Sequence, residues 1–378
     1  MKRLTAALLC VLMILAPLTV QAKGGYEEKY GTTEAYLKNC PTPTVGSMGG
    51  EWMVIGLARG NGISREMEEG YYQNVLSTVR DNGSEKLHRS KATENARVIL
   101  ALTAIGKDVT DVAGYNLLAP LADFKFVTKQ GLNGAVWTLI ALDSMLYDIP
   151  ETDAQDVTTR EKLIDCILSR QNESGGWDIK NDYADPDMTG MVLQSLAPYY
   201  EHNEAVKTAV DNALRVMSEN QLDDGGFLTY GSPTPESCAQ MLTALCSLGI
   251  DPQKDSRFIK NGRSVLDRML DFSVENGFEH LQNDGFNQMS TDQAFYAMTA
   301  LNRLENGKTA LYDMSDLLLP YDVNLDGQVN IIDATETQKY IAELRDFNLR
   351  QQKAAHADVN GKVNITVVTE IQRFISMQ

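Results

Sequence analysis

Asp187-Met-Thr-Gly-Met-Val-Leu-Gln-Ser-Leu196 carries the pattern that decides the fold of most of this chain. A polar residue stands at its start, an apolar residue follows six positions later, and a small residue with leucine ends it. Between residues 40 and 305, six segments end in such a pair, at Leu57, Leu102, Leu142, Leu196, Leu245 and Leu301. Their spacings of 45, 40, 54, 49 and 56 residues are typical of one helical hairpin per repeat.

Each of the six segments is predicted to form one helix. The residue three before each leucine is apolar: Val54, Ile99, Leu139, Leu193, Leu242 and Met298. Nine residues before each leucine, or ten before the first, stand Ser47, Thr93, Asn133, Asp187, Glu236 and Asp292. We expect these polar residues to cap the helices, with Glu236 the weaker cap, because their oxygens accept the free N–H groups of a first turn.

A second signature precedes three of the predicted helices. It is found as Gln171-Asn-Glu-Ser-Gly-Gly-Trp177, Gln221-Leu-Asp-Asp-Gly-Gly-Phe227 and Gln282-Asn-Asp-Gly-Phe286. The glycines suit a left-handed turn that ends the preceding helix. These residues resemble the Gln-Trp repeats of the prenyltransferase and squalene–hopene cyclase group. The resemblance implies an all-α toroid of six inner helices ringed by six outer ones, which we expect over residues 30–310.

The C-terminal region contains a different pattern, Asp322-Val-Asn-Leu-Asp-Gly-Gln-Val-Asn-Ile-Ile-Asp333. Oxygen-bearing side chains occupy loop positions one, three, five, nine and twelve, and glycine at position six permits a sharp turn. Calcium takes six to eight oxygen ligands at about 2.3–2.6 Å. The sequence therefore predicts a calcium site formed by Asp322, Asn324, Asp326, the Gln328 carbonyl, Asn330 and Asp333.

The loop and the segment after it recur further along the chain. Asp333-Ala-Thr-Glu-Thr-Gln-Lys-Tyr-Ile341 aligns with Val367-Val-Thr-Glu-Ile-Gln-Arg-Phe-Ile375, and Asp358 to Thr366 echoes the first loop. The pair resembles a type I dockerin over about residues 319–378. That resemblance implies binding to a cohesin domain on an extracellular scaffold of the cellulosome type. It implies a contact surface formed by Ile331, Ile332, Lys339, Ile365, Thr366 and Arg373.

The second loop departs from the first. It is two residues shorter, and Val367 stands where Asp333 closes the first loop. We therefore predict one strong calcium site rather than two. A module of this size usually needs a metal or another staple to fold, so loss of one site should lower its stability.

The N-terminus predicts export. Lys2 and Arg3 precede an apolar run to Ala16, and small residues favour cleavage after Ala22, so residues 1–22 are expected to be a signal peptide. The run is short for a membrane span. A net charge of −17 argues against nucleic acid and anionic membrane surfaces as partners. Cys238 and Cys246 lie too far apart on one predicted helix to form a disulfide, so buried free thiols are expected.

Two reactions of the resembled group lack their motifs here. The cyclase Asp-x-Asp-Asp motif has its nearest match at Asp185-Pro-Asp187, which lacks the third carboxylate. The zinc ligands of the prenyltransferases are partly mimicked by Glu236-Ser-Cys238, but no histidine stands near Gln293. Neither chemistry is therefore supported by the sequence.

Two functions for the toroid remain open. It could capture a small molecule, peptide or glycan in its central cavity. Alternatively, it could degrade polysaccharide with carboxylates at one mouth, the candidates being Asp187, Glu236 and Asp292. Glycoside hydrolysis needs two carboxyl groups about 5–9.5 Å apart. Trp52, Trp137 and Tyr296, one turn into three helices, could stack on sugars. The alternative for each of these residues is structural, with acids capping helices and aromatics filling the ring.

Overall fold

The computed structural model of the protein describes residues 24–180, 183–356 and 362–377. The expected signal peptide at residues 1–22 and the start of the second dockerin loop, with Asp358 and Asn360, lie outside the described residues. Among those that are described, no helix is both long enough and apolar enough to cross a membrane.

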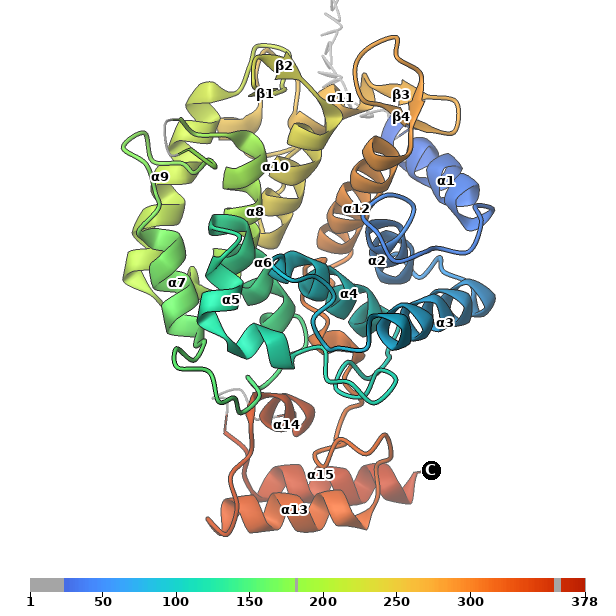
Figure 1. Cartoon of the computed structure of the whole chain (residues 1–378), viewed down its shortest axis with the longest axis vertical. Helices are drawn as coiled ribbons and strands as arrows, with labels where there is room; N and C mark the ends of the chain where they lie inside the picture. Colours follow the sequence, from blue (N-terminus) through green and yellow to red (C-terminus); the bar gives the residue numbers. More distant parts are fainter. Residues whose placement is uncertain (1–23, 181–182, 357–361, 378) are drawn as a thin grey trace, which may run out of the picture.

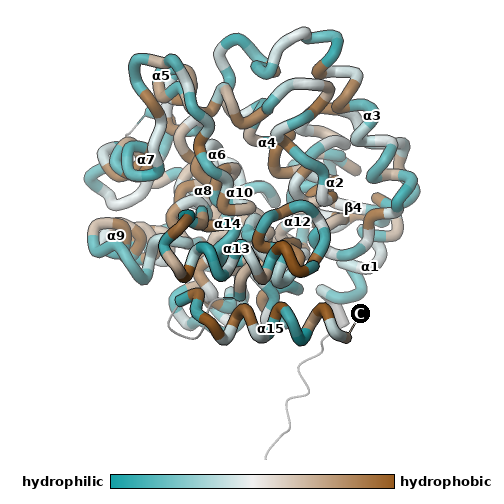
Figure 2. The backbone as a smooth tube through the Cα atoms, turned by 90° about the horizontal axis from the view of Figure 1, so that it is seen from below, coloured by the Kyte–Doolittle hydropathy of each residue, from teal (hydrophilic) through white to brown (hydrophobic). Residues whose placement is uncertain are grey.

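Six helices form a closed inner ring. They are α2 (Glu51–Arg59), α4 (Ala92–Ala104), α6 (Leu132–Asp143), α8 (Pro186–Leu196), α10 (Pro235–Ser247) and α12 (Gln288–Glu305). Each packs on the next, and α12 packs on α2, which closes the ring. Figure 1 shows this arrangement from the side, and Figure 2 shows it from below.

The outer layer consists of α1 (Gly24–Lys38), α3 (Arg65–Asn82), α5 (Phe124–Thr128), α7 (Arg160–Leu168), α9 (Glu204–Asn220) and α11 (Val265–Leu270). The first helix of the chain, α1, completes the ring by packing on α12 and α2. The expected toroid of six helical hairpins is confirmed. A single core of buried apolar residues runs from Tyr26 to Met314 through all of them.

Small residues bring neighbouring inner helices into close contact. A Cβ atom on Gly56 of α2 would lie 2.8 Å from the ring of Phe295 on α12. A Cβ on Gly190 of α8 would lie 2.9 Å from the backbone of Gln240 on α10. Glycine is therefore required at both crossings, as the small residues of the repeat indicated.

The predicted N-caps are wrong. The caps of α8, α10 and α12 are Asp185, Thr234 and Asn287, whose side chains accept backbone N–H groups of the first turn. α2, α4 and α6 begin after Gly50, Lys91 and Gly131 without a side-chain cap. In α8 and α10 a proline occupies the first turn, where its fixed φ and missing N–H are suited to a helix start. Asp187, Glu236 and Asp292 therefore lie inside their helices, and capping does not explain them.

The glycine-rich signature forms left-handed turns as predicted, but these turns do not end the outer helices. α7, α9 and α11 end earlier, at Leu168, Asn220 and Leu270, with no left-handed cap. Gly175, Gly225 and Gly285 have φ values of 103°, 89° and 80°, in the left-handed region that glycine favours. The side-chain amides of Gln171 and Gln221 donate to the carbonyls of Gly175 and Gly225. Trp177 and Phe227 are fully buried, which fixes each turn against the ring.

Short strands extend the loops at the N-terminal ends of the inner helices. β1 (Leu228–Thr229) pairs antiparallel with β2 (Ser232–Pro233), with Leu228 opposite Pro233. β3 (Ser273–Val274), β4 (Gly277–Glu279) and β5 (Phe286–Asn287) form a second small sheet, in which Phe278 lies opposite both Ser273 and Asn287. We call this end of the ring the upper mouth and the opposite end the lower mouth. Four single-turn 3-10 helices lie at Ala119–Ala122, Ala197–Tyr199, Ser256–Phe258 and Ser315–Leu317.

The C-terminal module has its own core and sits below the lower mouth. α13 (Ile331–Ile341) and α15 (Ile365–Ser376) pack side by side, and α14 (Leu349–Ala354) lies between them and the toroid (Figure 1). The separate core is Val323, Val329, Ala334, Phe347, Ala355, Val367, Val368 and Ile371. At the interface, Asn348 Nδ2 donates to Asp148 Oδ2 at 2.7 Å, and the Arg350 guanidinium lies 5.1 Å from the Tyr147 ring centre.

The connector, residues 306–318, joins α12 to the C-terminal module and is fastened by a group of ion pairs. Asp316 pairs with Arg59 of α2 at 2.9 Å and with Arg303 of α12 at 2.7 Å. Arg59 also donates to the carbonyls of Leu311 and Asp313. We call Arg59, Arg303 and Asp316 the seam clamp, because they join the first and last inner helices where the chain leaves the ring.

Candidate functional site

Hydrogen bonds from backbone N–H groups to carboxylates shape the first loop of the C-terminal module. Asp322 accepts the N–H groups of Asp326 and Gly327 at 3.1 and 2.9 Å. Gly327 has a φ of 83°, as its place at the sharp turn predicts. Asp333, at the start of α13, accepts the N–H groups of Val323, Asn324 and Asn330, so it ties both ends of the loop together.

The donor set of this loop fits calcium. Nowhere in the described residues do three or more His, Cys, Asp or Glu side chains converge as a metal site, and the loop carboxylates point here toward N–H groups. The available donors are nevertheless all hard oxygens, from three carboxylates, two side-chain amides and a backbone carbonyl. Two of the carboxylates, on Asp322 and Asp333, are buried. Buried carboxylates that have no cationic side chain as a partner are suited to a divalent cation.

The six residues expected to contact a cohesin are all exposed. The exposed fractions of Ile331, Ile332 and Ile365 are 61%, 50% and 62%, which is unusual for isoleucine. Thr366, Lys339 and Arg373 are exposed as well. The isoleucines stand at the N-terminal turns of α13 and α15, the two helices farthest from the toroid (Figure 1).

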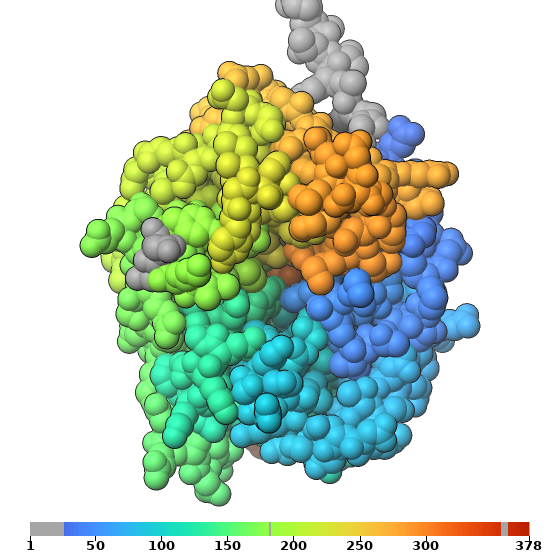
Figure 3. Space-filling model, turned by 45° about the horizontal axis from the view of Figure 1, so that its top comes forward, coloured from blue at the N-terminus to red at the C-terminus, as the bar shows by residue number. Residues whose placement is uncertain are grey.

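At the upper mouth, the structure brings two of the three predicted carboxylates together. Burial, with the charges of Asp185 and Glu236 nearby, raises the pKa of Asp187 to about 7. Its Oδ1 atom is buried without a hydrogen-bond partner. Glu236 accepts a hydrogen bond from Ser290 and lies 3.1 Å from His280 Nδ1. Figure 3 shows that this face is hollowed at its centre.

Asp292, the third predicted carboxylate, lies apart from this pair. It is fully buried, and its oxygens accept the Gly49 N–H at 2.8 Å and the Gln288 side-chain amide at 2.7 Å. Burial raises the pKa of Asp292 to about 7. These contacts fasten α12 to the loop before α2.

Aromatic side chains occupy the middle of the ring, below the carboxylates. Trp52 of α2 lies 4.9 Å from Trp137 of α6 and 5.9 Å from Tyr296 of α12, between ring centres. Gln240 of α10 donates to the Tyr296 hydroxyl at 2.7 Å. Because α2 and α6 are not neighbours in the ring, the contact between the two tryptophans spans its interior.

Sequence reasoning missed His280 as a member of the upper site. The turn after β4 places the His280 imidazole against Glu236, 44 residues away in the sequence. No local pattern links the two residues.

Cys238, in the segment that resembles zinc ligands, is buried in the core, and burial raises the pKa of its thiol to about 12.

Comparison with known proteins identifies the C-terminal module. Residues 320–375 match the family of the dockerin type I domain. The module is therefore a type I dockerin, a domain that binds calcium and serves as the docking partner of cohesins.

Two solved structures are similar to this chain at low sequence identity. A protein from Actinoplanes is 13% identical, with 74% of this chain and 99% of that chain covered and a TM-score of 0.44. A type II terpene cyclase from Scytonema is 11% identical, with coverages of 77% and 97% and a TM-score of 0.44. No curated protein matches the chain. Similarity at this level is no evidence for a shared activity.

Proposed function

We propose that this protein is an exported component of a cohesin-based complex, in which the dockerin anchors the toroid to a scaffold. The type I dockerin match carries this proposal. The exposed side chains of Ile331, Ile332 and Ile365 support it, because they lie on helices α13 and α15, which the toroid does not cover. Residues 1–22 act as the export signal, the toroid spans about 30–310 and the dockerin spans 319–378.

Calcium is the cofactor of the anchoring function. Asp322, Asn324, Asp326, the Gln328 carbonyl, Asn330 and Asp333 would hold it. When bound, the ion neutralises the carboxylates of the loop and fixes the start of α13. The isoleucines at that start are then presented to the cohesin, together with Lys339, Ile365, Thr366 and Arg373.

The test is calcium-dependent capture of the full-length mature protein on a panel of immobilised type I cohesins. We expect capture by at least one cohesin in 2 mM calcium, and loss of capture in excess EDTA. Capture that EDTA leaves unchanged would contradict the calcium role. Absence of capture by every cohesin in the panel would contradict the anchoring function.

For the toroid we propose a ligand-binding role at its upper mouth, with polysaccharide cleavage as the second candidate. One observation favours cleavage. Asp187 keeps its proton up to about neutral pH and lies near Glu236, which has its own hydrogen-bond donors. A protonated carboxyl beside a second carboxyl is the arrangement that glycoside hydrolysis uses.

Polysaccharide cleavage is tested by incubating the mature protein with a panel of plant cell-wall polysaccharides and measuring new reducing ends. Asp187→Ala and Glu236→Ala should abolish any release, whereas Asp292→Ala acts only if it disturbs the fold. Release that all three variants retain would place the reaction elsewhere. No release by the wild-type protein would favour the binding role.

A further inference from the structure

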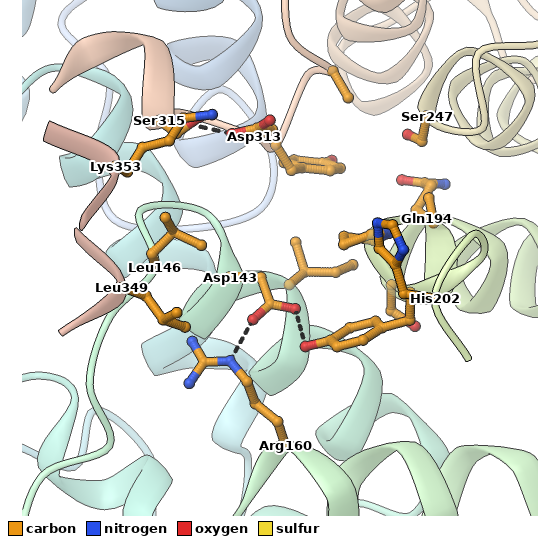
Figure 4. Close-up of a pocket in the computed structure, with 17 residues that line it drawn as sticks. Asp143, Leu146, Arg160, Gln194, His202, Ser247, Asp313, Ser315, Leu349 and Lys353 are labelled. Carbon is orange, nitrogen blue, oxygen red and sulfur yellow. Dashed lines mark hydrogen bonds and ion pairs between the residues drawn. The ribbon is translucent and has the colours of Figure 1, made fainter. Parts of the chain in front are cut away.

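A separate cavity of about 590 Å³ lies at the lower mouth, between the toroid and the dockerin (Figure 4). The C-terminal ends of α6, α8 and α10 and the connector form its toroid side. Leu349 and Lys353, both on α14 of the dockerin, line the other side. Its size falls within the range of small-molecule sites, about 300–1,000 Å³.

Most of the cavity wall is apolar, with side chains such as Ile140, Leu146, Pro198 and Leu349. The charged pair in the wall is already satisfied. Asp143 binds Arg160 Nε at 2.6 Å through one oxygen and the Tyr199 hydroxyl at 2.7 Å through the other (Figure 4). The other two charged residues in the wall, Asp313 and Lys353, carry opposite charges. The cavity therefore favours a neutral, mainly apolar occupant.

Two of the residues that line the cavity each have a buried polar atom without a hydrogen-bond partner. Gln194 Oε1 and the Tyr312 hydroxyl make no hydrogen bond, although the exposed fractions of these residues are only 5% and 7%. The Gln194 amide cannot simply be turned over, because its Nε2 donates to both the carbonyl and the side-chain oxygen of Gln240. A buried polar group without a partner is costly, so each atom favours a ligand that supplies one.

We propose that this cavity binds a neutral, largely apolar molecule that carries a hydroxyl or amide N–H group. The donor group bonds to Gln194 Oε1, and the Tyr312 hydroxyl donates to an oxygen of the ligand, which in a hydroxyl ligand is the oxygen of the same group. The apolar part packs on the ends of the inner helices and on Leu349. A free sugar fits poorly, since its many hydroxyl groups would meet mostly apolar wall.

The site is a composite of both modules, because a dockerin helix supplies part of its wall. This inference goes beyond the ligand-binding role proposed for the upper mouth, because it concerns the lower mouth and a different chemistry. It is independent of the upper carboxylates and of the cohesin-binding face on α13 and α15.

The test is calorimetric titration of the full-length mature protein with 2-naphthol, a neutral aromatic with one hydroxyl group, and with naphthalene as the matched probe without it. We expect saturable binding of one 2-naphthol per chain and at least tenfold weaker binding of naphthalene. Gln194→Met and Tyr312→Phe should each weaken 2-naphthol binding about tenfold, equivalent to about 1.4 kcal/mol. Leu349→Trp, which narrows the cavity from the dockerin side, should weaken it further.

Two control variants locate the effect. Tyr26→Phe removes the hydroxyl of an equally buried tyrosine on α1, which donates to the Met298 carbonyl outside the cavity, and should bind 2-naphthol normally. Asp187→Ala should also bind normally, and loss there would place the probe at the upper mouth and overturn the inference. Circular dichroism of each variant checks that the toroid is folded. Calcium-dependent cohesin capture, which reports on the dockerin, is expected to be unchanged.

The inference is overturned if the wild-type protein shows no saturable binding of 2-naphthol, or if both cavity variants bind it as tightly as the wild type. If one cavity variant fails to fold, the other variant and the comparison with naphthalene still decide. Failure of cohesin capture by the wild type would contradict only the anchoring proposal.

Discussion

Asp187 differs from the other residues of the toroid because its Oδ1 atom is buried without a structural role such as helix capping. Asp185, two residues earlier, caps α8, so Asp187 is free of that task. One of its oxygens is buried without a partner, and the neighbouring hydroxyls of Ser237 and Thr229 only partly offset the rise in its pKa. A carboxyl held in this way lowers stability when it ionises, which is common at functional sites.

The first prediction concerns the pH dependence of stability. The folded-state pKa of Asp187 is raised from 3.8 to about 7, so the folded state binds its proton more tightly than the unfolded state does. The free energy of unfolding should therefore fall as the pH rises from about 4 to 7. Asparagine cannot ionise, so the free energy of unfolding of Asp187→Asn should not show this decrease. Between pH 4.5 and pH 8, we expect it to rise by about 2 kcal/mol relative to that of the wild type.

Urea denaturation of both proteins at pH 4.5, 6 and 8 measures this difference, and calcium held constant removes the dockerin from the comparison. A gap between variant and wild type that does not change with pH would show that Asp187 ionises normally.

At the level of single residues, the sequence predicted part of the upper site. Asp187 and Glu236 were found because they recur at one position of the repeat. His280 was missed because its contact with Glu236 depends on how the turn after β4 folds over the mouth. Gln194 and Tyr312 were missed because an unpartnered atom is a property of packing, which no spacing in the sequence reveals.

Among the elements, the first dockerin loop is expected to control the fold of the whole C-terminal module. Asp326 lies at its centre and accepts the Gln328 N–H at 2.9 Å. Asp326→Ala should abolish the strong calcium site and unfold the module, because the small core around Val323 and Val367 is weak without the ion. Asn360→Ala, the matching change in the second loop, should have a smaller effect.

Calcium titration by calorimetry, followed by circular dichroism with and without EDTA, measures both effects. Two equal calcium sites in the wild type would contradict the interpretation of the second loop as degenerate.

The helices α13 and α15 carry the prediction for cohesin binding. Replacing Ile331 and Ile332 together by glutamate should lower cohesin affinity by at least a hundredfold, because charges would enter an apolar contact. Leu344→Glu is the matched control, since Leu344 is 77% exposed just after α13 but lies outside the proposed contact surface. Surface plasmon resonance on a cohesin that captures the wild type gives both affinities. An equal loss of affinity in the control would show that the contact surface extends to Leu344.

The boundaries of elements were harder to predict than their existence. All six inner helices lie where the repeat places them, but their caps were misplaced by two to five residues in α8, α10 and α12. Proline at the start of α8 and α10 decides these positions, and it is visible in the sequence. The start of α12 depends on the pairing of β5 with β4 just before it, which the sequence pattern does not show.

For the whole molecule, the seam clamp should contribute to the stability of the closed ring. Burial alone would raise the pKa of Asp316, but Arg59 and Arg303 hold it below its usual value. Asp316→Ala leaves the Arg59 guanidinium, only 2% exposed, without its carboxylate. We expect a loss of about 2 kcal/mol in the free energy of unfolding, reduced from the value for a fully buried pair because Asp316 is partly exposed.

Denaturation of Asp316→Ala beside Asp156→Ala, an exposed carboxylate paired with Lys162, separates this loss from that of an ordinary surface ion pair. Equal stability of the two variants would show that the ring closes without the clamp.

The closed ring itself was expected from the resemblance of the glycine-rich signature to the Gln-Trp repeats, and the count of six repeats agrees with a ring of six hairpins. The placement of the dockerin against the lower mouth could not be predicted. It depends on side-chain contacts such as Asn348 with Asp148, and on a connector held by Arg59 and by a hydrogen bond from Met314 N–H to the Ser144 carbonyl. None of these contacts is part of the repeat pattern in the sequence.

The position of the seam clamp determines how the molecule carries mechanical load. A protein held by its dockerin and pulled through its toroid transmits tension along the connector. That tension meets Asp316 and the bonds from Arg59 to the connector before it reaches α12. The clamp thus resists traction that would otherwise separate the last inner helix from the first.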